Sequence, residues 1–181
     1  MPTMASSTRA RHDLSTQEKN FLRALGNIGV LSRSDAVRHF GQDTLSRLQQ
    51  LKLVMPKTAI VDGKNITVLR MSSMGKKHTH RYIIHGSLYK VSSYQVKHDL
   101  KLSKHYLSIT PEERKTWLND AGVKKYLKDK QHKGELDGAY KNAKGQMVAV
   151  EVFTASYRSK VAAEKLHTAE TCFDEKEILR A

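Results

Sequence analysis

Two carboxylates, Asp137 and Glu151, stand where they could share one divalent metal ion. Asp137 lies in the run Gly-Glu-Leu-Asp-Gly, within a strand predicted over residues 134–140, and Glu151 lies near the end of an apolar strand predicted over 147–153. Carboxylates on paired antiparallel strands can converge on a hard cation such as Mg²⁺, which takes a few oxygen ligands and keeps the rest as water. A bound metal ion would lower the pKa of its water and stabilise charge on a phosphate under attack.

The sequence allows two environments for the Glu151 side chain, buried or exposed to solvent. The strand alternation places its side chain on the same face as Met147 and Ala149, opposite Val150 and Val152. A carboxylate buried in so apolar a strand is costly unless it is paired or binds a metal ion. The alternative is that this face of the strand meets solvent, where an acidic residue needs no partner.

The charge of the chain favours a polyanionic partner. The formal net charge is +14 over 181 residues. Residues 1–91 carry 15 Lys and Arg against 5 Asp and Glu, whereas the remaining residues carry 17 against 13. Basic side chains displace counterions from nucleic-acid phosphates, so double-stranded DNA is the expected partner of the first half. An RNA-binding or ribosome-associated protein would explain the charge as well, but not the paired carboxylates.

The first half has the pattern of a winged helix-turn-helix over residues 14–82, after a flexible lead-in over 1–13. Ser15 and Glu18 form a capping-box pattern that opens a helix, and two short helices follow, separated at Gly41. Strands predicted over 53–61 and 66–71 flank a hairpin turn at Asp62-Gly63. The third helix and its neighbours supply the expected DNA contacts, which are Arg33, Arg38, Gln42, Thr44, Ser46, Arg47 and Lys64.

The second half, residues 83–181, predicts a small α/β domain, so the whole chain is expected to be α+β. Ser92 or Ser93 is expected to cap a helix over 94–107. Thr110 to Glu113 form a second capping box, and the helical region that follows it is expected to divide at Gly122. The two strands follow, and a last helix is predicted over 158–172. The second half therefore surrounds the paired carboxylates with helices.

The order of these features resembles a known nuclease family. A strand Asp, a hairpin, a strand Glu and a nearby Lys resemble the PD-(D/E)xK nucleases, which have the restriction-endonuclease-like fold. With a winged helix and the helix bearing His98-Asp99-Leu100 ahead of it, the order is similar to replication-relaxation proteins and to the MOBC class of plasmid mobilization relaxases. The resemblance runs from about Leu14 to Cys172.

The resemblance implies a metal-dependent endonuclease that nicks DNA at the transfer origin of a mobile element. It implies that Asp137 and Glu151 are catalytic and bind Mg²⁺ or Mn²⁺. The family lysine is expected two residues after the glutamate, where this chain has Phe153, so Lys165 and Lys160 on the following helix are the candidates for that role. Relatives that act as regulators imply an alternative, an inactive DNA-binding regulator or relaxosome accessory protein on the same fold.

Three further residues have two readings each. Tyr157 is either a nucleophile of the kind other relaxases use or an aromatic residue that packs at the start of the last helix. His98 and Asp99 either face the carboxylates from their helix or form a pair on its surface.

The composition bears on the cellular compartment of the protein and on the kinds of site that cysteines could form. The single cysteine, Cys172, excludes an internal disulfide framework and a cysteine-based zinc site. The sequence has no run of about 18 apolar residues and begins with a polar segment, so a cytoplasmic protein with no membrane partner is expected. Other transfer or replication proteins and a second copy of the chain are further candidate partners.

Overall fold

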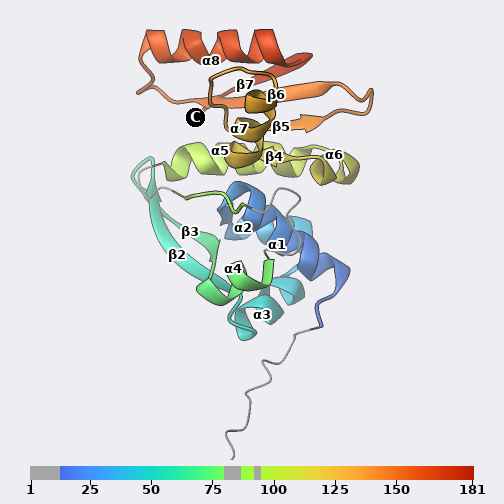
Figure 1. The fold of residues 1–181 in the computed structure, drawn as a ribbon. Helices are drawn as coiled ribbons and strands as arrows, with labels where there is room; N and C mark the ends of the chain where they lie inside the picture. The colour runs from blue at the N-terminus through green and yellow to red at the C-terminus, as the bar shows by residue number, and fades with distance from the viewer. Residues whose placement is uncertain (1–12, 80–86, 92–94) are drawn as a thin grey trace, which may run out of the picture.

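The computed structural model describes residues 13–79, 87–91 and 95–181, and it has the mixed α+β fold that the sequence predicts (Figure 1). The predicted lead-in, apart from Asp13, and the predicted boundary at residues 82 and 83 lie outside the described residues. The helices are α1 Thr16–Ile28, α2 Arg33–Phe40, α3 Gln42–Gln50, α4 Ser73–Thr79, α5 Val96–Ser108, α6 Pro111–Lys115, α7 Asp120–Asp129 and α8 Ser159–Cys172. The strands are β1 Leu31–Ser32, β2 Val54–Val61, β3 Lys64–Met71, β4 Leu118–Asn119, β5 Gly138–Lys141, β6 Met147–Phe153 and β7 Glu175–Arg180.

Local sequence signals fix the N-terminal elements. The Ser15 side chain accepts from the Glu18 backbone and the Glu18 side chain accepts from the Ser15 backbone, so the predicted capping box opens α1. Gly41 separates α2 from α3 with a φ of 82°, which a residue with a side chain rarely adopts. Asp62 and Gly63 both have positive φ, as a two-residue hairpin turn requires, and β2 pairs with β3 on either side of them.

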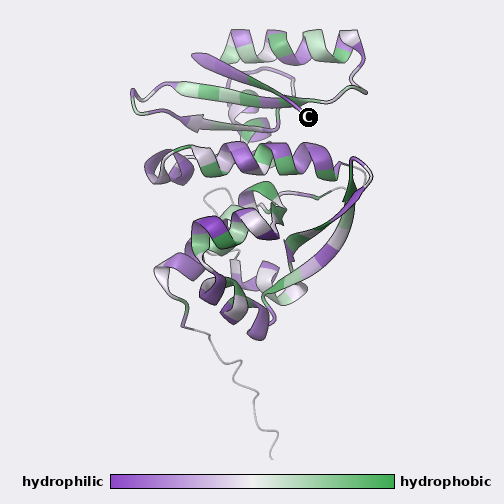
Figure 2. Ribbon diagram, turned by 180° about the vertical axis from the view of Figure 1, so that it is seen from behind, coloured by the Kyte–Doolittle hydropathy of each residue, from purple (hydrophilic) through white to green (hydrophobic). Residues whose placement is uncertain are grey.

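The second half forms a four-stranded sheet in the order β4-β5-β6-β7. The pairs β4–β5 and β5–β6 are antiparallel, whereas β7 runs parallel to β6 because α8 carries the chain back across the sheet. Figure 1 shows α8 over one face of this sheet and α5 against the other, between the sheet and the N-terminal helices. Figure 2 shows β6 as a largely hydrophobic strand between two more hydrophilic ones.

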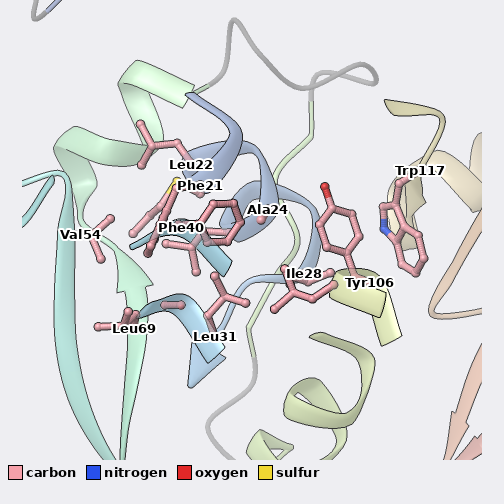
Figure 3. Close-up of a cluster of buried hydrophobic side chains, with 14 of the residues drawn as sticks. Phe21, Leu22, Ala24, Ile28, Leu31, Phe40, Val54, Leu69, Tyr106 and Trp117 are labelled. Carbon is pink, nitrogen blue, oxygen red and sulfur yellow. The ribbon is translucent and has the colours of Figure 1, made fainter. Parts of the chain in front are cut away.

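One continuous core joins the two sheets through α5. The close-up in Figure 3 shows Phe21 and Ile28 of α1 on one side and Tyr106 and Trp117 on the other. The Tyr106 and Trp117 rings meet edge to face with centroids 5.2 Å apart. A second cluster packs α7 and α8 on the opposite face of the four-stranded sheet. Helix α5 is therefore held from both sides, which fixes the residues it presents to the sheet.

The structure departs from the sequence-based expectation in several places. The strands β1, β4 and β7 were not predicted, and β5 begins at Gly138, so Asp137 immediately precedes the strand. The helical region after Thr110 divides at residues 116–119, not at Gly122. Helix α5 begins at Val96 after Gln95, and the predicted caps Ser92 and Ser93 lie outside the described residues. Two-residue strands are too short to leave a periodic pattern, which explains why β1 and β4 were missed.

Within the described ranges, none of the helices has both the length and the apolar character needed to span a membrane.

Candidate functional site

Glu151 lies at the centre of a buried polar cluster on β6. It is 1% exposed and shares its face with Met147 and Ala149, toward α8, as the strand alternation predicts. The Lys165 ammonium on α8 is 2.7 Å from Glu151 Oε1, and the Tyr157 hydroxyl donates to the same oxygen over 3.1 Å. Burial of Glu151 is thus settled, and the carboxylate has the partners that burial requires.

Asp137 joins this cluster from the residue just before β5. Its backbone N–H donates to Glu151 Oε2 over 3.1 Å, and its own Oδ2 accepts from the Val152 N–H over 2.7 Å. These two bonds join the residue before β5 to β6 and hold Asp137 beside Glu151. The Asp137 side chain is 13% exposed whereas that of Glu151 is fully buried, so Asp137 is the carboxylate of the pair that solvent reaches.

The helix α5 contributes His98 and Asp99. His98 Nε2 lies 2.9 Å from Asp137 Oδ2, and its Nδ1 lies 3.1 Å from Asp99 Oδ1. Asp99 Oδ1 also accepts from the Tyr89 hydroxyl over 2.9 Å, while Asp99 Oδ2 is buried with no hydrogen-bond partner among the residues that the structure describes. His98 therefore faces the carboxylates, as the first interpretation predicts, whereas Asp99 contacts His98 and Tyr89 and is connected to Asp137 through His98. A hydrogen-bonded chain runs from Tyr89 through Asp99 and His98 to Asp137.

We call Asp137, Glu151, Lys165, His98 and Tyr157 the carboxylate centre, and its electrostatics are strongly perturbed. Burial and the nearby Asp137 raise the pKa of Glu151 to about 7, although Lys165 opposes this. Burial alone would lower the pKa of His98, but its hydrogen bonds to Asp137 and Asp99 outweigh burial and raise it to about 9. Burial likewise disfavours charge on Lys165, but Glu151 and Asp137 raise its pKa. Such shifts are typical of functional sites and of structural ion-pair networks alike.

The oxygen donors of the centre suit a hard divalent cation, but both carboxylates are already occupied by contacts with the protein. Two carboxylates from neighbouring strands are the oxygen donors that Mg²⁺ or Mn²⁺ takes. Both carboxylates already contact protein donors, and the described residues hold no group of three or more His, Cys, Asp and Glu side chains arranged to bind a metal ion. A cation bound by Asp137 and Glu151 would therefore replace some of the contacts that these side chains make now.

The structure separates the predicted members of the site. Lys165 contacts Glu151, whereas Lys160 is exposed in the first turn of α8. Tyr157 is hydrogen-bonded to Glu151, and its ring also packs beside Phe153 with centroids 5.4 Å apart, so neither of its two readings describes it fully. Sequence reasoning missed Tyr89, which reaches Asp99 from an irregular segment and leaves no periodic signal.

The predicted DNA-contacting residues lie in the N-terminal half, away from the carboxylate centre. Arg33, Arg38, Gln42, Arg47 and Lys64 are exposed, and Thr44 and Ser46 are partly exposed. Several of them also have partners within the chain. Arg47 Nε lies 2.8 Å from Glu18 Oε1, Arg38 pairs with Asp35, and Gln42 donates to Ser46. Arg47 therefore supports the start of α1 whether or not it contacts DNA.

Comparison with known proteins identifies no relative of this chain. No protein-family model, no curated protein and no solved structure matches it. The function is consequently inferred from the carboxylate centre and from the charge around it.

Proposed function

We propose that this chain is a DNA-binding, metal-dependent endonuclease-like protein that nicks double-stranded DNA at the transfer origin of a mobile element. The observation that carries the proposal is the contact of Lys165 with Glu151, 2.7 Å apart, beside Asp137. Two acids at adjacent strand ends and one lysine are the side chains that metal-assisted phosphodiester cleavage uses. The resembled family has its lysine two residues after the glutamate, where this chain has Phe153. In the proposed site, Lys165 on α8 takes the place of that lysine.

Four residues of the carboxylate centre have a role in this proposal. Asp137 and Glu151 would hold the Mg²⁺ or Mn²⁺ ion, which when bound supplies an activated water and stabilises charge on the phosphate. Lys165 would balance negative charge that develops on the attacked phosphate. His98 hydrogen-bonds Asp137 and so positions that carboxylate, in the way that outer partners orient metal ligands.

The arrangement of elements supports the same proposal. Three helices α1–α3 followed by the β2–β3 hairpin are consistent with a winged helix that grips DNA. Helix α5, three antiparallel strands, α8 and a parallel strand β7 are consistent with a PD-(D/E)xK-like domain, with one acid just before β5 and the other on β6. A cytoplasmic location and contacts with other transfer proteins remain predictions of the same reading.

The test is metal-dependent nicking by the full chain. Supercoiled plasmid carrying the native element is incubated with the protein and Mg²⁺ or Mn²⁺, with EDTA as the negative control. We expect conversion to open circle that Asp137→Ala and Lys165→Met abolish and that the matched variant Lys160→Met leaves intact, because Lys160 is exposed on the same helix. Nicking that survives Asp137→Ala, or that Lys160→Met abolishes equally, would contradict the assignment.

A second function is favoured by the closed state of the centre. Asp137 and Glu151 are both satisfied by protein donors, which suits an inactive scaffold in a DNA-binding regulator or accessory protein. Titration with Mn²⁺ discriminates the two functions. Binding that is lost in Asp137→Ala supports the nuclease, whereas retardation of DNA with neither nicking nor Mn²⁺ binding supports the regulator.

A further inference from the structure

A basic groove of about 1040 Å³ lies between α2, the β2–β3 hairpin, α5 and the end of β7. Figure 1 shows the hairpin reaching from the N-terminal helices to one end of α5, which closes the groove on that side. The basic side chains that line it come from three elements far apart in the sequence, and they are Arg33, Arg38, Lys97, Lys101, Lys104 and Arg180. The fold therefore gathers cations that no single sequence motif contains.

The groove has more positive charge than its own carboxylates neutralise. Its two acidic residues are already paired, Asp35 with Arg38 at 2.7 Å and Asp62 with Lys97 at 3.0 Å. The other four basic side chains make no ion pair with any carboxylate of the described residues, and they are Arg33, Lys101, Lys104 and Arg180. An anionic partner is the way to satisfy charges gathered so closely.

The spacing of the cations suits a row of phosphates. Lys97, Lys101 and Lys104 lie along one face of α5, and the helical rise of about 1.5 Å per residue spreads them over roughly 10 Å. One strand of a duplex places a phosphate every 3.4 Å or so along the axis, so this face spans about three of them. Across the groove, Arg33 in the first turn of α2 adds a guanidinium to the opposite wall.

The groove shares elements with the carboxylate centre, although no residue of the centre lines it. Lys97 precedes His98 on α5, and Arg180 of β7 lies opposite Phe153, two residues beyond Glu151 on β6. One wall of the groove therefore includes the helix α5 that carries His98 and the strand β7 that pairs with β6.

We propose that this groove binds the phosphodiester backbone of one strand of duplex DNA and leads that strand to the carboxylate centre. The inference rests on the proposed function for its choice of DNA. The described residues that line the groove include no aromatic side chain on which an unstacked base could lie, which favours the backbone of a duplex over a single strand. Contacts of this kind carry no base sequence, so the groove supplies affinity and α3 supplies recognition.

The test uses two double variants of the full chain that change charge equally. Lys101→Gln with Lys104→Gln removes two lysines of the groove, and Lys125→Gln with Lys128→Gln removes two exposed lysines at the same spacing on α7. Binding of a labelled 20-base-pair duplex is measured by fluorescence anisotropy in EDTA across a range of salt concentrations. Because EDTA prevents cleavage, this binding is scored separately from nicking.

We expect the groove variant to lower the slope of log K against log salt by about 2 and to weaken binding roughly 10- to 60-fold at 0.1 M salt, while the α7 variant stays near the wild-type protein. Equal losses in the two variants would mean a general charge effect, and an unchanged slope in the groove variant would mean that DNA lies elsewhere. Either result overturns the proposal, as does absence of duplex binding by the wild-type protein.

Two comparisons separate this proposal from the proposed function. Wild-type nicking with an unchanged slope in the groove variant would overturn the groove and leave the nuclease standing. A lowered slope in a protein that never nicks would support the groove and contradict the nuclease. A single-stranded oligonucleotide of the same sequence that binds more tightly than the duplex would contradict the assignment to duplex backbone.

Discussion

The buried pair of Glu151 and Lys165 predicts a stability loss that grows with pH when the lysine is removed. Among the described residues, Lys165 is the only cation that contacts the fully buried Glu151 carboxylate, so Lys165→Met leaves that carboxylate the Tyr157 hydroxyl and the Asp137 N–H. At pH 5.5 the Glu151 carboxyl, whose pKa is about 7, is mostly protonated in the wild-type protein. The variant then loses only a hydrogen bond and some packing, about 1 kcal/mol.

At pH 8.5 the loss is larger because the wild-type carboxylate is ionised and the variant cannot support that charge. Glu151 in the folded variant stays protonated, whereas it ionises when the variant unfolds. The variant therefore loses about 2 kcal/mol of stability relative to the wild-type protein over the 1.5 pH units above the wild-type pKa of Glu151. The expected total loss is about 3 kcal/mol at pH 8.5, which agrees with the range of about 3–5 kcal/mol for breaking a buried ion pair.

Urea unfolding at the two pH values measures this difference directly. Lys165→Met introduced into Glu151→Gln is the control, because glutamine cannot ionise and the loss should then be the same at pH 5.5 and 8.5. Lys160→Met, exposed on the same helix, should change stability by less than about 0.5 kcal/mol. A loss in Lys165→Met that does not depend on pH would refute the reasoning, since it would mean that Glu151 holds its charge without the lysine.

Three further predictions concern residues around the core and the centre. His98 has a pKa of about 9 in the folded protein against 6.5 in the unfolded chain, so it contributes roughly 3 kcal/mol to the free energy of unfolding below pH 6.5, and this contribution is lost as pH rises through 9. The free energy of unfolding of His98→Asn should therefore fall less between pH 6.5 and 9 than that of the wild-type protein. Gly138→Ala would place a Cβ 2.4 Å from Trp117 and should cost about 1–3 kcal/mol in thermal or urea unfolding, and an unchanged stability would mean that the ring moves freely. Arg47→Ala should destabilise the protein by about 1–2 kcal/mol by leaving the buried Glu18 carboxylate without its cation, and Glu18→Gln in the same chain should recover most of that loss.

The sequence predicts well those elements whose signals are local. Capping residues, a positive-φ glycine and an Asp-Gly turn act within a few residues, so the first helices, the β2–β3 hairpin and the bounds of β6 follow from short windows. Strand β7 is different, because Glu175–Arg180 is a highly charged segment that becomes a strand only by pairing with β6. No local preference announces a strand that depends on a partner so far back in the chain.

The candidate site was predictable in its residue types but not in its connections. Strand alternation correctly placed Glu151 on the face of Met147 and Ala149, and the two candidate lysines on the last helix included Lys165, which contacts Glu151. The contact of His98 with Asp137 joins residues on α5 and before β5, and helical periodicity cannot say which element a buried polar residue will meet. That long-range pairing is what distinguishes a hydrogen-bonded centre from two acids on a hairpin.

Helix α5 shows why the lysines of the groove cannot be interpreted from α5 alone. Its buried residues, among them His98 and Tyr106, occupy most of its circumference, so Lys97, Lys101 and Lys104 fill the face that an amphipathic helix leaves to solvent. Lys125 and Lys128 on α7 satisfy the same requirement at the same spacing. The difference lies across the groove, where Arg33 and Arg180 add positive charge that a solvated helix face does not need. Concentrating like charges on facing walls raises the energy of the free protein, and a bound polyanion relieves that repulsion.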